Sequence, residues 1–137
     1  MSENTVLKAC QQRLPPAAVR GLEHFNAGEF FEAHEFLEAA WQAERGPVRE
    51  LYRGVLQVAV AYYHIQRGNL AGAFKLFARS RKWLAPFGPV CQGIHLAHLL
   101  RDVDRVEAES RRLSPAQAAA LESSFFHPVE YQTEHEG

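Results

Sequence analysis

The residues best suited to chemistry lie in a glutamate-rich stretch with helical spacing. His34 and Glu38 are four residues apart, so on an α-helix they share one face. At about 100° per residue they project beside the apolar stripe of Phe30, Leu37 and Trp41, not opposite to it. A histidine beside a carboxylate can act as an oriented general base. The spacing therefore predicts a half-buried His–Glu pair, with the other glutamates of this stretch pointing toward solvent.

A second polar line runs along the stretch 47–67, which is apolar around most of its circumference. A helix of this kind is central in its fold. The polar line consists of Glu50, Arg53, Gln57 and His64. The small residues Gly54 and Ala61 lie between them and would let a neighbouring helix approach closely. If the two helices pack antiparallel, their polar groups meet, and buried polar groups need such partners.

Three interpretations of the combined set remain open. The candidate ligand-binding residues are His34, Glu35, Glu38, Arg53, Gln57 and His64. They could form a structural polar network that fixes how two helix hairpins pack. They could instead line a catalytic or small-molecule pocket in which Arg53 holds an anionic group. Finally, His34, Glu38 and His64 could bind a divalent metal, although no H-E-x-x-H motif is present. The spacing does not decide between these interpretations.

Other candidates are weaker. His95 and His98 stand one helical turn apart, which suits a metal but is also common on exposed helix faces. A basic cluster could contact phosphates or an acidic partner, or simply complement the negative end of a helix dipole. That cluster consists of Lys75, Arg79, Arg81 and Lys82. Trp41 and Trp83 are predicted to be core residues.

Glycine and proline divide the chain into helical segments. No stretch alternates strictly between polar and apolar residues and no Asn-Gly turn occurs, so strands are not expected. Ser114 to Gln117 forms a capping box that predicts a short last helix. The predicted helices span about 15–26, 29–43, 47–67, 69–84, 93–111 and 115–123. The sequence therefore predicts an all-α fold of two packed helix hairpins, extended by a fifth long helix and a short sixth.

A weak internal repeat supports the hairpins. Residues 28–33 align with residues 68–73, forty positions later, and both copies have glycine first and alanine last. The pattern G-x-[FY]-x-x-A of the first copy is typical of tetratricopeptide-like helix hairpins. Only two copies occur, which favours a pair of hairpins over a superhelical array.

Composition bounds the protein class. The chain has 137 residues, with 15 Lys and Arg against 16 Asp and Glu. It therefore lacks the excess of basic residues that is typical of proteins that bind nucleic acids. One domain over 1–137 is expected, with a helical core at about 16–112 and a short helix and tail at 113–137. No apolar run is long enough to cross a membrane, and residues 1–8 do not resemble a signal peptide. Cys10 and Cys91 are far apart and suggest no disulfide framework, so a reducing cytoplasm is expected.

The motif positions together resemble the domain of unknown function 309 family. The resemblance covers about residues 20–84 and is carried by two stretches, F-F-E-A-H-E-x-L-E-x-x-W at 30–41 and G-N-x-x-G-A at 68–73. Its motif positions here are Glu32, His34, Glu35, Glu38, Trp41, Gln57, His64 and Asn69. The family consists of small all-helical proteins of bacteria and archaea. The resemblance implies a compact helical fold and no established activity.

The sequence therefore favours a non-enzymatic interaction or assembly module that contains a buried polar network. The alternative is a small-molecule-binding protein or metal-dependent enzyme that uses the cluster of His34, Glu38 and His64. No cofactor is expected unless a divalent metal binds there. The expected partner is an unknown protein or small molecule, a homo-oligomer is possible, and neither nucleic acid nor membrane is expected.

Overall fold

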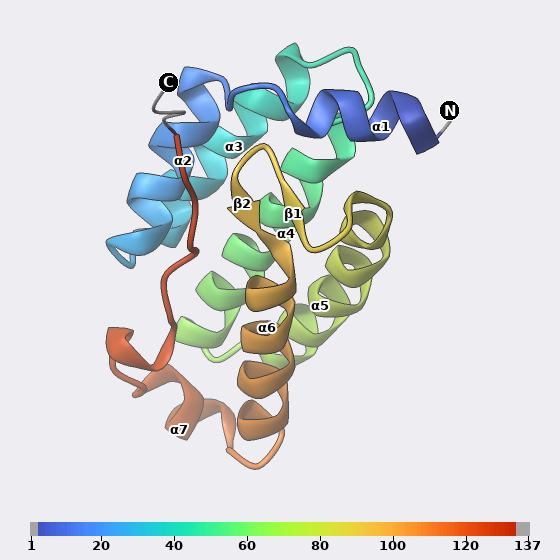
Figure 1. Ribbon diagram of the computed structural model, residues 1–137. Coiled ribbons are helices and arrows are strands. Elements are labelled where there is room, and N and C mark those ends of the chain that lie inside the picture. Colours follow the sequence, from blue (N-terminus) through green and yellow to red (C-terminus); the bar gives the residue numbers. More distant parts are fainter. Residues whose placement is uncertain (1–2, 134–137) are drawn as a thin grey trace.

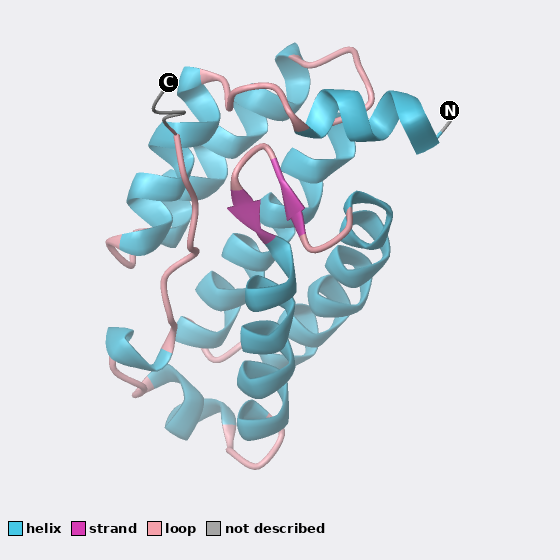
Figure 2. Cartoon of the chain, in the orientation of Figure 1, coloured by secondary structure: helices cyan, strands magenta, loops and turns pink. Residues whose placement is uncertain are grey.

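The computed structural model describes residues 3–133 and is built almost entirely of helices (Figures 1 and 2). The α-helices are α1 (Glu3–Cys10), α2 (Pro16–Asn26), α3 (Phe30–Ala43), α4 (Arg49–Gln66), α5 (Leu70–Leu84), α6 (Leu96–Ser110) and α7 (Pro115–Ala119). The short elements are η1 (Ala85–Phe87), β1 (Val90–Cys91), β2 (Ile94–His95) and η2 (Ser123–Phe125). The predicted all-α fold is confirmed.

Two helix hairpins, α2/α3 and α4/α5, form the body of the protein. Each turns at a glycine with left-handed backbone, Gly28 at φ 80° and Gly68 at φ 76°, where a side chain would be strained. The alanines of the two repeat copies, Ala33 and Ala73, are both fully buried. The forty-residue repeat therefore marks two equivalent turns, and α3 and α5 are the second helices of equivalent hairpins.

Helix α4 is the central element, and it lies between α3 and α5 (Figure 1). The ring of Tyr62 on α4 is fully buried and packs within 6 Å, between ring centroids, of aromatic rings from α2, α3, α5 and the C-terminal segment. Those rings are Phe25, Phe30, Phe77 and Phe126. Burial raises the pKa of the Tyr62 hydroxyl, and the negative charge of Asp102 raises it further. This aromatic cluster joins α2, α3, α4 and α5 to the C-terminal segment.

Helices α4 and α5 approach each other very closely at Gly54. A Cβ atom built on Gly54 would lie 2.5 Å from Cγ of Leu84, which is fully buried. The small residue predicted at this position therefore allows the close packing of the second hairpin.

Helix α1 and its attachment were not predicted. Cys10 at its end forms a disulfide with Cys91, which corrects the expectation that these cysteines are unrelated. Sequence separation alone hides such a pair, because the chain must fold before the two residues become neighbours. Gln92 strengthens the junction, because its backbone N–H donates to the Cys10 carbonyl and its side-chain amide donates to the Ala9 carbonyl.

The short hairpin β1/β2 corrects the expectation that strands are absent. Gln92 and Gly93 form its two-residue turn with φ values of 50° and 82°. Positive φ at both central positions is the geometry that Asn-Gly usually supplies, and here Gln-Gly supplies it. The hairpin takes residues 93–95 from the predicted fifth helix, so α6 begins only at Leu96.

The C-terminal segment docks on the body. It runs beside α6 and α2 (Figure 1), and Tyr131 forms a β-bridge with Ile94, next to the hairpin. The side chain of Asn26 donates to the carbonyl of Val129 (2.9 Å) and accepts from its N–H (2.7 Å). Residues 134–137 of the predicted tail lie outside the described part.

The capping box is confirmed: Ser114 and Gln117 bond each other's backbone N–H groups at the start of α7. That helix is shorter than predicted, because it ends at Ala119. Within residues 3–133, no helix combines the length and the apolar character required to cross a membrane.

The first prediction concerns the close approach of α4 and α5. Gly54→Ala places a methyl group against Leu84, and we expect this overpacking to lower the free energy of unfolding by about 1–3 kcal/mol. The loss should occur although alanine favours a helix more than glycine does. Urea denaturation of the variant and the parent measures it. In a Leu84→Ala background the same change should cost less, and an equal cost there would contradict the proposed contact.

The second prediction concerns the docked tail. Asn26→Ala removes both hydrogen bonds to Val129, and we expect faster amide hydrogen exchange at Val129 and its neighbours. The helices of the body should keep their exchange rates, since Asn26 lies at the exposed end of α2. Hydrogen-exchange mass spectrometry or NMR measures both effects. Unchanged exchange at Val129 would show that these bonds do not hold the tail.

Candidate functional site

The polar residues singled out in the sequence lie along one strip between α3 and α4. At one end of the strip the guanidinium of Arg53 lies 4.9 Å from the ring centroid of Trp41. At the other end the rings of Phe31 and Tyr63 are 5.7 Å apart. The two helices are therefore antiparallel, which was the condition for their polar groups to meet, and these groups follow the same crevice. We call this surface the α4 strip; its α4 residues are Arg53, Gln57, Val60, Tyr63 and His64.

A stack of aromatic rings and guanidinium groups forms one end of the α4 strip. Arg53 lies between Trp41 of α3 and Trp83 of α5, with its guanidinium 4.9 Å and 4.3 Å from the two ring centroids. Arg49 covers the Trp41 ring at 4.3 Å, and Glu50 holds Nε of Arg53 at 2.8 Å. Cation–π contacts of this kind order long side chains. Both tryptophans are only partly buried, so they line the strip and are not the core residues that were predicted.

A small apolar pocket forms the other end. Its cavity has a volume of about 130 Å³ and is lined by Phe30, Phe31, His34, Val60, Tyr63 and His64. Phe31 is 48% exposed and is one of three large hydrophobic residues among those described that are exposed. Burial lowers the pKa of His64, which favours the neutral form of its imidazole. Asn69, the N-cap of α5, lies 3.4 Å from Nδ1 of His64.

The candidate residues do not converge on one point. Arg53 and His64 are eleven residues apart on α4, which is about 16 Å at 1.5 Å per residue. His34 and Glu38 form only a loose ion pair, with 3.9 Å between Nε2 and Oε2. Glu35 is exposed to solvent and is not part of this pair. The arrangement is therefore an elongated surface and not a catalytic centre.

The predicted buried polar network is not what the structure shows. His34 and Arg53 have side chains 29% and 28% exposed, and Glu38 is 45% exposed. Oε1 of Gln57 and Nε1 of Trp41 are buried, yet neither has a hydrogen-bond partner among the described residues. These side chains were expected to form hydrogen bonds with one another. The antiparallel packing of α3 and α4 instead places them at different positions along the helix axes.

The metal interpretation gains no geometric support. Within the described range 3–133, no three His, Cys, Asp or Glu side chains are grouped so that they could hold a metal ion together. The proposed set of His34, Glu38 and His64 is included in that statement. His95 and His98 are separated as well, since His95 ends β2 and His98 pairs with Glu130 of the tail.

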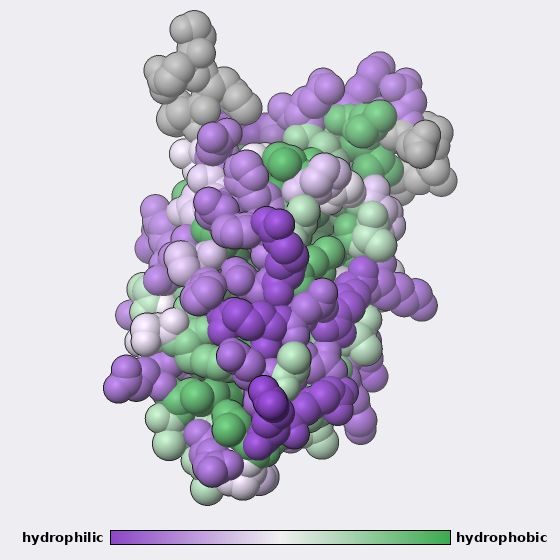
Figure 3. Space-filling view, turned by 60° about the horizontal axis from the view of Figure 1, so that its bottom comes forward, coloured by the Kyte–Doolittle hydropathy of each residue, from purple (hydrophilic) through white to green (hydrophobic). Residues whose placement is uncertain are grey.

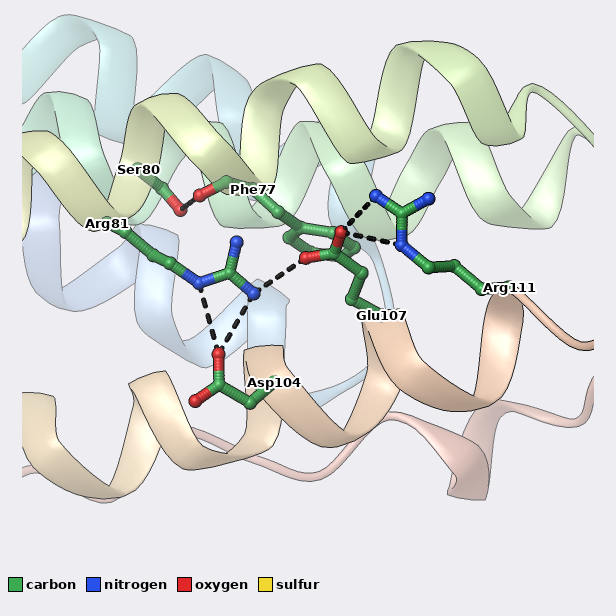
Figure 4. A network of polar contacts seen from close by, with 6 residues as sticks. All are labelled: Phe77, Ser80, Arg81, Asp104, Glu107 and Arg111. Carbon is green, nitrogen blue, oxygen red and sulfur yellow. Dashed lines mark hydrogen bonds and ion pairs between the residues drawn. The ribbon is translucent and has the colours of Figure 1, made fainter.

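The basic cluster of α5 divides between two faces. Arg81 turns toward α6, where it contacts Asp104 at 2.9 Å and Glu107 at 2.7 Å (Figure 4). Arg111 bonds the same Glu107 carboxylate at 2.6 Å, so this network fastens α6 to α5. Local sequence patterns contain no signal for this pairing, because it depends on how α6 folds back onto α5. Lys75, Arg79 and Lys82 remain exposed to solvent.

Exposed apolar side chains also occur outside the α4 strip. Leu7 and Val90 are 58% and 46% exposed, and both line a surface cavity of about 530 Å³ beside α1 and η1. On the face in Figure 3, hydrophilic residues predominate and separate the hydrophobic areas from one another. Sequence reasoning missed Phe31, although its position next to the buried Phe30 turns it toward a different face of α3.

The fold and the strip define a small protein of paired helix hairpins whose central helix is open along one side. The family model described as "Domain of unknown function (DUF309)" matches residues 18–76, a segment that extends from α2 into α5. The resemblance predicted from the sequence is confirmed, because residues 18–76 match this family model.

Two curated relatives are similar over parts of the chain. The uncharacterized protein YpuF of Bacillus subtilis (strain 168) is 37% identical over 86 residues, which cover 61% of this chain and 49% of the relative. An uncharacterized protein of Aquifex aeolicus (strain VF5) is 35% identical over 46 residues, 33% of this chain and 14% of the relative. The matches thus span about half or less of these relatives, and neither name states an activity.

The third prediction concerns the network between α5 and α6. Burial alone would raise the pKa of Glu107, but the hydrogen bonds from Arg81 and Arg111 outweigh it and lower the pKa below its usual 4.5. A carboxylate with a lowered pKa stabilises the folded state above its ordinary pKa, and this contribution is lost as the pH falls through the lowered value. Glu107→Gln should therefore reduce the free energy of unfolding by about 1–3 kcal/mol at neutral pH.

Urea denaturation at several pH values measures this effect. The difference between Glu107→Gln and the parent should shrink as the pH falls below 4.5. The matched control is Glu122→Gln, because the Glu122 side chain is exposed and makes no ion pair with any described residue. A difference that stays constant with pH would contradict the role of the Glu107 carboxylate.

Proposed function

We propose that this protein is a non-enzymatic interaction module that binds a protein partner along the α4 strip. The observation that carries the proposal is the exposed ring of Phe31 at the rim of the apolar pocket. Aromatic side chains beside a pocket are typical anchors of protein interfaces. The partner would place an apolar side chain into this pocket.

The composition of the strip fits recognition. Tryptophan, tyrosine and arginine are enriched in protein interfaces, and the strip offers Trp41, Tyr63, Trp83 and Arg53. The Trp–Arg–Trp stack supports this use, because side chains that are already ordered lose less entropy on binding. The strip is also elongated, which suits contact with another helix or extended surface.

The enzymatic alternative has less support. A general base needs a substrate group within hydrogen-bond reach and an anion-holding group close by. The His34 end of the strip and Arg53 lie at opposite ends of the crevice, and the cavity of about 130 Å³ beside His34 is small for a typical substrate. Binding of a protein partner does not require these side chains to meet at one point, so it is compatible with their distribution along the crevice.

The fourth prediction tests the proposal with matched variants. Phe31→Asp places a charge at the apolar-pocket end of the α4 strip, whereas Leu7→Asp changes an apolar side chain of α1 that is even more exposed, at 58% against 48%. The two variants and the wild type are immobilised and exposed to an extract of the cells that produce the protein. We expect the wild type and Leu7→Asp to retain the same bound proteins and Phe31→Asp to lose at least one of them.

Circular dichroism of all three proteins serves as the folding control. Since Phe31 is half exposed, its replacement should leave the helical spectrum unchanged. If Phe31→Asp retains every protein that the wild type binds, its copies in solution included, the α4 strip is not a binding surface and the proposed function is wrong.

A further inference from the structure

The helices on either side of the α4 strip carry opposite charges. Helix α3 contains three glutamates and no lysine or arginine, while α5 contains four basic residues and no acidic one. Among the described residues, Glu32 and Glu35 of α3 make no ion pair, and neither do Lys75 and Arg79 of α5. The chain as a whole has a formal charge of only −1, so this separation is local.

The charges on the two helices also lie at matching heights. The stack of Trp41, Arg53 and Trp83 places α3 and α5 at the same level, with positions 42 residues apart opposite each other. Both helices are antiparallel to α4 and so parallel to each other. Glu32, Glu35 and Glu38 thus lie level with positions 74, 77 and 80 of α5. Lys75, Arg79 and Lys82 are within two residues of these levels, or about 3 Å along the axis.

This pattern is complementary to itself. Two copies can meet face to face around a two-fold axis that lies in the interface. If the axis runs parallel to α4, α3 of each copy lies over α5 of the other, and acidic residues face basic ones. If the axis runs across α4, each α3 faces the other α3, and like charges repel. The charges therefore favour one symmetric arrangement over the other.

We infer that the partner on the α4 strip is a second copy of this chain, docked around a two-fold axis parallel to α4. The inference rests on the proposed function and names its partner. Phe31, Val60 and the two tryptophans form the centre of the interface, and the glutamates of α3 and the cations of α5 form its rim. Exposed ion pairs add little affinity individually, so the apolar centre supplies the binding and the charges select the orientation.

The fifth prediction uses charge reversal on the full chain. The wild type should sediment in analytical ultracentrifugation with twice the 15.5 kDa mass of the chain, and the dimer should weaken as salt is raised. The variant Glu35→Lys/Glu38→Lys gives α3 a net positive charge, so that both flanking helices are basic. In Lys75→Glu/Arg79→Glu the two new glutamates outnumber Lys82 among the unpaired charges of α5, because Arg81 pairs with α6, so that both flanking helices present net negative charge. Each variant alone should dimerise at least tenfold more weakly than the wild type.

An equimolar mixture of the two variants provides the decisive measurement. In a mixed dimer each basic helix faces an acidic one, so dimers containing one copy of each variant should form again. Two chains of unequal mass, one carrying a small tag, allow the mixed species to be identified. Circular dichroism checks that each variant keeps its helices, and the restored dimer is itself evidence that both are folded.

Three results would overturn the inference: a monomeric wild type, variants that dimerise as well as the wild type, or a mixture that stays monomeric. The proposed function has a separate test. If the wild type is monomeric but Phe31→Asp still loses a different bound protein, the α4 strip is an interaction surface and only the second copy is excluded. If the wild type dimerises and Phe31→Asp dimerises equally well, the second copy does not bind at the α4 strip and the inference is wrong, whereas the proposed function is still decided by the proteins that Phe31→Asp retains or loses.

Discussion

The burial of α4 is the constraint on which the rest of this structure depends. This helix is apolar on nearly all sides, and its residues Leu51, Val55, Val58, Tyr62 and Ile65 are fully enclosed. A helix with such a surface must be covered by neighbours almost all around. Helices α3 and α5 lie against its two flanks, and the aromatic cluster around Tyr62 joins it to α2 and the C-terminal segment. What remains uncovered is a single line of side chains, and that line is the α4 strip.

The helices of the two hairpins could be predicted because local signals agree with the global fold there. Gly28 and Gly68 supply the left-handed turns, and apolar residues repeat with helical period between them. The disulfide between Cys10 and Cys91 and the bridge from Tyr131 to Ile94 could not be predicted in this way. Both connect segments that are distant in sequence, so they depend on a tertiary arrangement that local patterns do not contain. The Gln92–Gly93 turn was missed because glutamine seldom occupies a left-handed position.

The candidate site shows the same division. Helical spacing correctly placed the polar groups of α3 and α4 along facing sides of two antiparallel helices, but it gives angles around an axis and not positions along it. Antiparallel packing sets Trp41 opposite Arg53 and Phe31 opposite Tyr63, and this register spreads the set over the length of the crevice. The expectation of a mutually bonded network assumed a single meeting point. Whether Arg81 faces solvent or α6 likewise depends on the fold of a distant segment.

A net charge near zero concealed the most informative electrostatic feature. Opposite charges that are mixed along each helix would pair within the molecule and leave a neutral surface. Here they are sorted by helix, and among the described residues no ion pair joins a glutamate of α3 to a cation of α5. Like charges on one helix repel at the spacing of one turn, a small cost that recurs on both helices. This repulsion is not compensated within the chain. A partner that places cations over α3 and carboxylates over α5 would relieve it, and the aromatic residues of the α4 strip lie between these two helices. The same chain, turned over, has that pattern.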